Sequence, residues 1–380
     1  MIHARPLLTM FLVAASLPAL GQWEMESSHT KADLRGIHSA GGGVAWASGT
    51  SGTILRTEDG GYLWQNCNTP PDAGTLDFRS IWAWDAQNAV VMSSGKGDDS
   101  RLYRTSDGGA SWKLLYTNPD ADGFWDALVF TDKKHGIILG DPVDGRFVIL
   151  RTEDGGLHWR KTDDPDLAAS PRGEGAFAAS NSSYVAIPFS GKYTTDTPLG
   201  AAMEFFGTSG PGGPHVFYMA MRDLEPAAGK GTRAKAPREP KMAPKWMKNP
   251  VPLAKSAASM GVFSLGFRDA FTGIAVGGDY LQPDESAGTA AYTEDNGNGW
   301  LAAAKPPHGY RSSVAWSEPD KAWVTVGTNG ADASYNDGKS WQPITISPDG
   351  GPWNALGLPW VVGPKGRIAK LVSLGKKAAK

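Results

Sequence analysis

The sequence is poor in the residues that build most metal and redox sites. Its 380 residues include one cysteine, Cys67, which excludes an intramolecular disulfide and a multi-thiolate metal site. Its seven histidines show no spacing suited to a metal cluster, and no nucleophile elbow or phosphate-binding loop occurs. A net charge of −2 gives no field that would attract nucleic acid. We therefore expect no metal, no cofactor and no nucleic-acid partner.

Long apolar runs are also scarce, and the one clear example lies at the N-terminus. It covers residues 7–20, follows Arg5 and ends in the small residues of Ala19-Leu20-Gly21. The run is short for a transmembrane helix, which leaves an uncleaved anchor as the alternative. We predict a signal peptide over 1–21 and an exported protein, periplasmic or extracellular, or lumenal in the thylakoid if the host is photosynthetic.

Glycine and tryptophan are plentiful, with 48 and 15 residues respectively, and they mark a repeat. The segment Thr57-Glu58-Asp59-Gly60-Gly61-Tyr62-Leu63-Trp64 recurs from Thr105 and again from Thr152, at steps of 48 and 47 residues. Looser copies cover 293–300 and 334–341. The pattern S/T-x-D-x-G-x-x-W is an Asp-box, typical of a tight hairpin turn between two strands.

The chemistry of this box predicts structure rather than catalysis. The Asp side chain accepts hydrogen bonds from turn amides, the Gly adopts positive φ, and the Trp packs between neighbouring sheets. The predicted structural residues of the boxes are Asp59, Trp64, Asp107, Trp112, Asp154, Trp159, Asp295, Trp300 and Trp341.

Two further features of the sequence each recur seven times. Apolar strands run into a Gly turn at 45–49, 90–95, 137–140, 204–207, 274–277, 323–327 and 360–363. Inner strands are expected to begin at 34–37, 78–81, 124–128, 174–177, 262–265, 310–314 and 353–356. The predicted fold is an all-β, seven-bladed β-propeller with four antiparallel strands per blade.

The seventh unit lacks an outer strand, and residues 22–29 offer one from the other end of the chain. We expect this N-terminal strand to complete the last blade and close the ring. The propeller is predicted over 22–372, followed by a basic tail over 373–380. In the fourth unit, residues 223–245 replace the Asp-box with six Lys or Arg and four Pro, which predicts a mobile surface insertion.

Antiparallel strands sort the remaining residues onto two faces. The starts of the inner strands share the face opposite the Asp-boxes, near the mouth of the central channel. The candidate partner-binding residues there are Arg35, Arg79, Asp126, Glu174, Arg311 and Asn354. Arginines that converge in this way need carboxylates or an anionic ligand. Both an internal charge network and a partner-binding site fit the sequence.

At this point the residues resemble a known family. The segments Leu34-Arg35-Gly36-Ile37-His38, Phe78-Arg79-Ser80-Ile81, 140–147 and 261–265, together with the boxes, are similar to those of the photosystem II stability/assembly factors. The resemblance covers nearly the whole mature chain and implies a seven-bladed propeller that scaffolds membrane-protein assembly. It also implies that an arginine-bearing face binds the partner, with Arg35, Arg79 and Arg311 as the counterparts here.

We therefore expect a non-catalytic exported propeller that binds a protein partner, for example a loop of a membrane protein. The alternative is a sialidase-like glycoside hydrolase or carbohydrate-binding propeller, with Tyr310, Glu174 and Asp126 beside the arginines. Against it, the Arg-Ile-Pro motif of sialidases is absent and the blade count is seven, not six. An oxidoreductase is disfavoured because no dinucleotide, haem or copper motif occurs.

Overall fold

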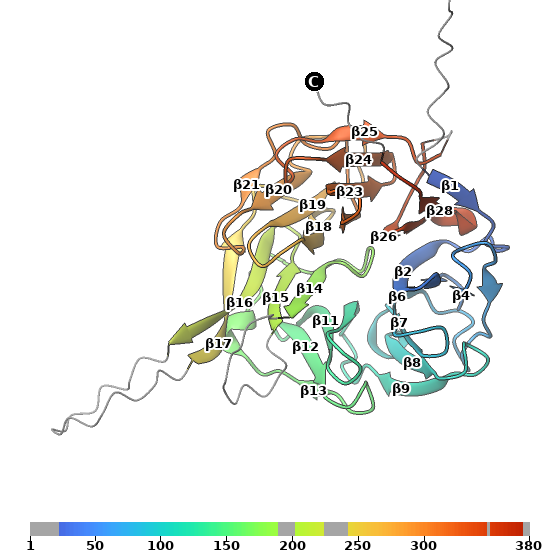
Figure 1. The fold of residues 1–380 in the computed structure, drawn as a ribbon. Coiled ribbons are helices and arrows are strands. Elements are labelled where there is room, and N and C mark those ends of the chain that lie inside the picture. The colour runs from blue at the N-terminus through green and yellow to red at the C-terminus, as the bar shows by residue number, and fades with distance from the viewer. Residues whose placement is uncertain (1–22, 189–201, 224–241, 348–349, 375–380) are drawn as a thin grey trace, which may run out of the picture.

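The protein is a ring of seven four-stranded antiparallel sheets around a central channel, as Figure 1 shows. The computed structural model describes residues 23–188, 202–223, 242–347 and 350–374. Within these ranges there is no α-helix, only the three short 3-10 turns η1 (Gly97–Asp99), η2 (Pro165–Leu167) and η3 (Pro364–Gly366). None of the helical elements described is long enough to cross a bilayer. The predicted seven-bladed all-β propeller is therefore confirmed.

Each blade runs outward from a first strand at the channel to a fourth strand at the rim. The first strands are β2 (Leu34–Gly41), β6 (Phe78–Ala83), β10 (Trp125–Phe130), β14 (Tyr184–Pro188), β18 (Met260–Phe267), β22 (Ser313–Ser317) and β26 (Ala355–Gly357). The second strands are β3 (Val44–Gly49), β7 (Ala89–Ser93), β11 (Gly136–Val143), β15 (Ala202–Gly207), β19 (Gly273–Asp279), β23 (Ala322–Gly327) and β27 (Trp360–Val362). The third strands are β4 (Ile54–Thr57), β8 (Arg101–Thr105), β12 (Arg146–Thr152), β16 (His215–Asp223), β20 (Ala290–Thr293), β24 (Gly330–Ser334) and β28 (Ile368–Leu371). The fourth strands are β5 (Gln65–Asn66), β9 (Lys113–Thr117), β13 (Arg160–Lys161), β17 (Met242–Pro250), β21 (Leu301–Ala302), β25 (Gln342–Ile344) and β1 (Trp23–Glu26).

The core lies between blades rather than inside any one of them. All of β7 and all of β19 are buried, because neighbouring blades cover both faces of these strands. This explains why the strands are continuous apolar runs without polar alternation. One cluster joins Leu139 and Ile149 of blade 3 to Phe206 and Phe217 of blade 4. The ring is thus held by apolar contact between successive sheets.

The N-terminal strand closes the ring, as predicted. β1 pairs with β28, with Trp23 opposite Leu371 and Glu26 opposite Ile368. Trp64 Nε1 of blade 1 donates to Glu26 Oε2 over 2.6 Å, so the closing strand is also bound to the adjacent blade. The two ends of the propeller therefore share one sheet, and no outer strand of blade 7 is missing.

Five turns between third and fourth strands have one hydrogen-bond pattern. In blade 2, Thr105 Oγ1 donates to Asp107 Oδ1 over 2.8 Å, and Asp107 Oδ1 accepts from the Ser111 amide over 2.9 Å. Gly109 follows with φ of 83°, a conformation that glycine adopts without strain. The sixth blade has Asn336 in the place of the aspartate, with Ser334 and the Ser340 amide as its partners. The Trp residues of all five turns are buried.

The structure differs from the prediction at the inner strand of blade 4, at the insertion and at the C-terminal tail. Blade 4 begins at Tyr184, so the expectation of its inner strand at 174–177 is wrong. The hairpin β16–β17 takes up Asp223 and 242–245 from the expected insertion, and 224–241 lie outside the described residues. The predicted signal peptide also lies outside them, as do 375–380 of the predicted tail. Leu374, expected in that tail, is buried.

Candidate functional site

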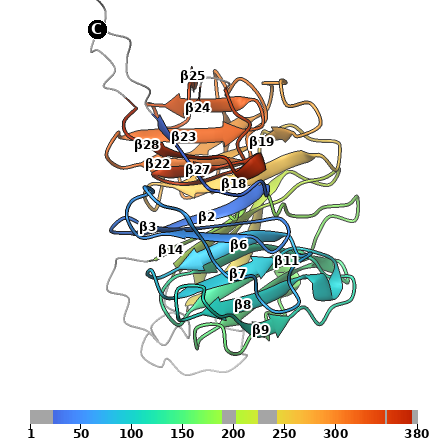
Figure 2. The same cartoon turned by 90° about the vertical axis from the view of Figure 1, so that its right-hand side faces the viewer.

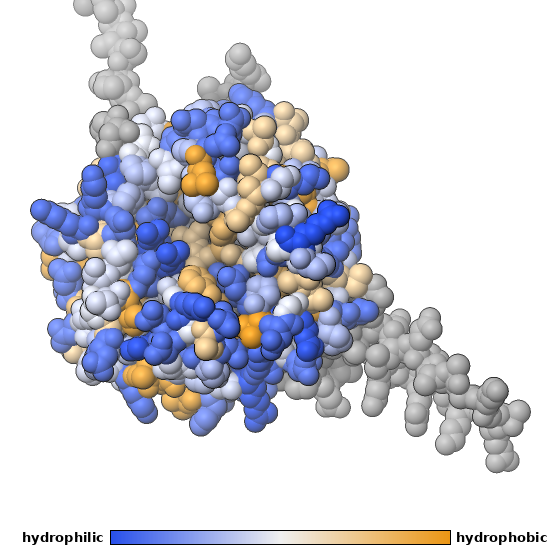
Figure 3. Space-filling model, turned by 180° about the vertical axis from the view of Figure 1, so that it is seen from behind, coloured by the Kyte–Doolittle hydropathy of each residue, from blue (hydrophilic) through white to orange (hydrophobic). Residues whose placement is uncertain are grey.

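The propeller has two unlike faces, which Figure 2 shows from the edge of the ring. The turn face carries the five repeat turns between third and fourth strands. The mouth face carries the starts of the first strands and the turns between second and third strands. Figure 3 shows the mouth face, where a hollow near the centre has a pale, partly apolar floor and a hydrophilic surround. The candidate site is this hollow.

Bulges aim side chains into the mouth. The first strands of blades 1, 2, 3 and 5 each have a register shift near their start, and the extra residues are Arg35, Arg79, Asp126 and Phe263. A β-bulge leaves one residue unpaired in the ladder and redirects its side chain. The same local irregularity, repeated in four blades, therefore gathers two arginines, an aspartate and a phenylalanine near the channel.

The channel is crossed by a segment of the chain itself. Residues 175–183, here called the plug, lead into β14 and project into the centre of the ring in Figure 1. Hydrogen bonds join the plug to four other blades, through Arg79, Leu128, Leu265 and Ser312. The mouth is therefore the entrance to an obstructed channel, and the plug forms part of its floor.

Arg35 differs from the other two candidate arginines because its charge is unpaired. It forms no ion pair or hydrogen bond with any residue in the described ranges, and its Nε is buried without a partner. Its side chain is partly exposed, so the guanidinium remains accessible from the mouth. A buried donor without an acceptor costs free energy, which a ligand acceptor would recover. Arg35 is thus the strongest binding candidate at this face.

Arg79 is already engaged, although not completely. Its Nε donates to Asp77 Oδ2 over 2.8 Å, and one Nη reaches the carbonyl of Ala178 in the plug over 3.4 Å. About a third of its side chain remains accessible, with a relative exposure of 30%. Arg79 therefore supports the plug and still presents positive charge at the mouth.

Asp126 is buried beside Arg79 and Asp141. Its Oδ2 has no hydrogen-bond partner within the described structure. Burial raises the pKa of Asp126 well above its ordinary value, and the neighbouring Asp141 raises it further, against a smaller opposite effect from Arg79. Burial also raises the pKa of Asp141, whose Oδ1 accepts from the Ala176 amide of the plug over 2.8 Å. Asp126 lies behind the surface rather than on it.

Glu174 is held by blade 4. His215 Nδ1 and Lys248 Nζ lie 2.8 Å and 2.6 Å from its two oxygens, and Thr208 Oγ1 donates over 2.5 Å. Burial alone would raise the pKa of Glu174, but these bonds and one from the Ser170 amide lower it to about 2. The carboxylate anchors the start of the plug and pairs with no arginine.

Arg311 does not reach the mouth, which corrects its predicted place there. Its amide donates to a glycine carbonyl of the preceding blade, as do the amides of Leu34 and Trp353. All three side chains are 0% exposed. Arg311 therefore shares the register of residues that point between blades, and a shift of one residue along a strand reverses the side chain. Ser312, the next residue, follows the register of the mouth.

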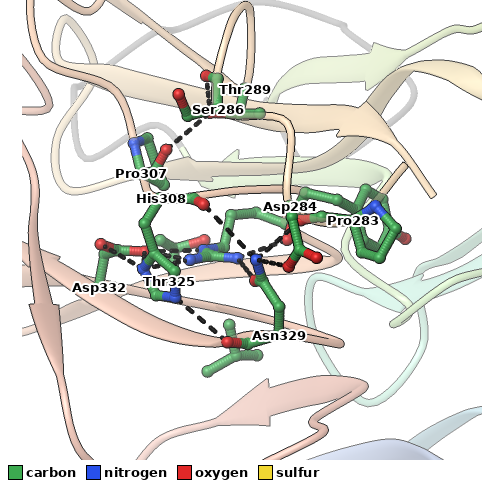
Figure 4. A network of polar contacts seen from close by, with 12 residues as sticks. Pro283, Asp284, Ser286, Thr289, Pro307, His308, Thr325, Asn329 and Asp332 are labelled. Carbon is green, nitrogen blue, oxygen red and sulfur yellow. Dashed lines mark hydrogen bonds and ion pairs between the residues drawn. The ribbon is translucent and has the colours of Figure 1, made fainter. Parts of the chain in front are cut away.

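Figure 4 shows the polar network around His308, Asn329 and Asp332 in blade 6. The buried Arg311 guanidinium lies at the centre of this network. It forms an ion pair with Asp332, donates over 2.6 Å to both Asn329 Oδ1 and the Tyr310 carbonyl, and contacts His308. Asn329 in turn donates to the Pro283 carbonyl over 2.8 Å. The charge is satisfied internally, so Arg311 has a structural role here.

Asn354 also has internal partners. Its Nδ2 donates to the Leu34 carbonyl over 2.8 Å, which joins blade 7 to blade 1. Its backbone carbonyl accepts a hydrogen bond from Ser312 Oγ over 2.7 Å. Of the six predicted residues, the structure therefore leaves Arg35, Arg79 and Asn354 partly accessible, and of these only Arg35 has a side chain without a partner in the described structure.

Sequence reasoning missed an aromatic cluster beside Arg35. Phe177 of the plug stacks on Phe263 with ring centroids 3.6 Å apart, and Phe263 meets Tyr310 edge to face at 4.8 Å. Tyr280 lies within 6.5 Å of all three rings. The bulge pattern, which aligns Phe263 with Arg35 and Arg79, is the sequence signal that points to it.

No metal-binding set is assembled in the described residues. No three His, Cys, Asp or Glu side chains come together to hold a metal ion there. The sialidase-like combination is also not formed, because Glu174 bonds to His215 and Lys248, while Arg311 is buried. A groove of about 420 Å³ between blades 5 and 6 is lined by charges that pair with each other, such as Arg268 with Asp337.

Comparison with known proteins shows the same fold in solved structures. No family model matches the sequence, and no curated protein matches it. The structure entitled "YCF48 bound to D1 peptide" is 17% identical, covers 94% of this chain and 99% of that chain, and has a TM-score of 0.58. YCF48 from Cyanidioschyzon merolae is 17% identical, with coverages of 92% and 98% and a TM-score of 0.52. The predicted resemblance to photosystem II stability/assembly factors is thus confirmed for the fold.

Proposed function

We propose that this chain is an exported, non-catalytic propeller that binds a protein partner at the mouth face. The partner presents an acidic segment, such as a loop of a membrane protein, to Arg35 and the accessible part of Arg79. The unpaired guanidinium of Arg35 carries this proposal. A carboxylate can accept two parallel hydrogen bonds from an arginine, which provides both energy and orientation.

Two observations support a protein ligand. A similarly folded propeller has been solved with a D1 peptide bound, at 17% identity to this chain. The mouth is a shallow hollow crossed by the plug, and shallow surfaces suit a peptide segment better than an enclosed small molecule. The hydrolase alternative has no supporting geometry in the described residues, because its predicted arginine and carboxylate set is not brought together.

The test is affinity capture after crosslinking in the cell of origin. Arg35→Glu and the double variant Arg35→Glu/Arg79→Glu are compared with the wild type. Arg160→Glu, on the exposed rim strand β13, is the matched control for a change of two charge units. Arg311 is left intact because reversal of a fully buried charge would destabilise the fold.

We expect one discrete partner with the wild type and the control, and its loss with the Arg35 variants. Thermal melts of the purified proteins show whether each variant is folded. If the partner is retained by folded Arg35→Glu/Arg79→Glu, the proposed site is wrong. Turnover of any labelled glycoside by the wild type would instead establish the hydrolase alternative.

A further inference from the structure

A turn of blade 5 places an exposed tyrosine and leucine beside the aromatic cluster. Tyr280 and Leu281 follow β19 and are 46% and 69% exposed. Asp279 Oδ1 accepts from the Leu281 amide over 3.0 Å, which fixes the turn. The rings of Phe263 and Tyr310 behind Tyr280 are buried, and Phe177 is partly exposed. The result is an apolar ledge with a rigid aromatic base.

The Arg311 network described above holds this turn in position. Asn329 Nδ2 donates to Pro283 O and also lies 3.1 Å from Asp284 Oδ1. The Tyr310 amide donates to the same Pro283 carbonyl over 2.9 Å. Arg311 fixes Asn329 over 2.6 Å. The buried arginine thus acts on the ledge through Asn329, as a positioning residue.

The ledge lies next to the unpaired positive charge. Burial raises the pKa of the Tyr310 hydroxyl, and Arg35 is near enough for its charge to oppose that effect. Tyr310 belongs to blade 6 and Arg35 to blade 1, and the bulge that carries Arg35 recurs at Phe263 beneath the ledge, so both groups lie at the same mouth. One ligand segment lying over the hollow would contact both.

We propose that Tyr280, Leu281 and Phe177 form an apolar anchor site beside Arg35, for a large apolar side chain near a carboxylate in the same partner segment. This inference rests on the proposed function and names the chemistry of the partner. Charge complementarity selects the carboxylate, and the ledge selects an aromatic or branched aliphatic neighbour. Interfaces gain most of their affinity from such a combination of an apolar anchor and a paired charge.

The experiment selects a phage-displayed random peptide library on the immobilised wild type, on Asn329→Ala and on three further variants. The three further variants are Arg35→Gln, Tyr280→Ser/Leu281→Ser, and the matched control Tyr62→Ser/Leu63→Ser. The control removes another consecutive Tyr-Leu pair, 93% and 48% exposed, from a repeat turn on the turn face. Melting temperatures confirm that each protein is folded.

We expect the wild type and the control to enrich peptides that contain both an acidic and a large apolar residue. Arg35→Gln should lose the acidic enrichment, and Tyr280→Ser/Leu281→Ser should lose only the apolar enrichment. The best selected peptide should bind about tenfold more weakly to Tyr280→Ser/Leu281→Ser than to the wild type. Asn329→Ala should behave like the Tyr280→Ser/Leu281→Ser variant, since a purely structural role would reduce both enrichments together.

The two proposals fail in different ways. Apolar enrichment that is absent, or that persists in Tyr280→Ser/Leu281→Ser, overturns the anchor site and leaves the Arg35 site standing. Acidic enrichment that is absent, or that is unchanged in Arg35→Gln, overturns the proposed function. A wild type that enriches no peptide overturns both.

Discussion

The repeat turns of the turn face and the bulged residues of the mouth face differ in how their polar groups are bonded. On the turn face, the aspartate or asparagine of each of the five repeat turns is bonded within its own turn, as Asp107 is by Thr105 and Ser111. On the mouth face, Arg35 Nε and Asp126 Oδ2 are buried with no partner in the described structure. In the repeat turns these bonds fix the backbone of the hairpin, whereas at the mouth the unmet bonding capacity of Arg35 is where we place the proposed site.

The largest effect is expected at the ring closure, where strand β1 contacts the repeat turn of blade 1. Deletion of residues 22–30 removes β1 and leaves Trp64 Nε1 without its acceptor, Glu26. We expect a loss of about 3–5 kcal/mol in the free energy of unfolding, from the exposed apolar surface and the open sheet edge. A thermal melt of the mature protein measures it, with Glu26→Gln as the smaller control. An unchanged melt would show that the ring does not depend on this strand.

The same chemical change should have opposite signs on the two faces. Asp107→Asn removes a carboxylate whose hydrogen bonds, first those from Ser111, lower its pKa to about 2, so stability should fall at neutral pH. Asp126→Asn replaces a buried carboxyl whose pKa is raised, so stability should rise by about 1–3 kcal/mol.

The pH dependence supplies the sign check for Asp126. Because the pKa of Asp126 is raised in the folded state, this group stabilises the folded protein at pH values below its pKa in the unfolded chain. That stabilisation is lost as the pH rises through the pKa of the folded state. The gain of Asp126→Asn over the wild type should therefore grow as pH increases. Denaturant titrations at several pH values measure it, and a loss of stability in Asp126→Asn at neutral pH would contradict the assignment.

His38, in the middle of β2, titrates in the opposite direction. Burial lowers the pKa of His38 to about 4, and its ring lies 4.2 Å from that of Trp82. The unfolded chain binds the proton more tightly, so stability should fall as pH decreases from about 6.5 to about 4, by about 1–3 kcal/mol. His38→Gln should remove this part of the pH profile. Parallel profiles of wild type and His38→Gln would rule out the effect.

The smallest effect is expected in the repeat turn of blade 6, where an asparagine replaces the aspartate. Asn336 occupies the place that aspartate takes in the other four turns, with the same hydroxyl and amide donors. Asn336→Asp should make these hydrogen bonds charge-assisted and raise stability by about 0.5 kcal/mol. Asn336→Ala is the control, expected to lower it. Calorimetry ranks the three proteins by stability. A less stable Asn336→Asp would show that a carboxylate stabilises only the four turns that already contain aspartate.

The sequence predicted the fold well because local chemistry repeats. Thr, Asp, Gly and Trp at fixed spacing specify one turn wherever they occur, and seven apolar strands ending in Gly specify the blade number. The residues that face the mouth were harder to predict, because the direction of their side chains depends on strand register. Arg311 was placed one residue out of step, although Ser313-Val314 aligns with Gly36-Ile37 and would have shown it. The plug was invisible because its small residues, 178–183, carry no periodic pattern, and Glu174 to Phe177 imitates a strand start.

The plug has a consequence for the kind of guest the mouth can accept. An open bore would favour a chain end that enters and threads through the ring. Here the bore is obstructed by residues bonded to four other blades, so a partner bound at the proposed site would lie across the rim and leave by the way it came. No free terminus is then required. A loop whose two ends remain attached to a larger body can dock and be released intact.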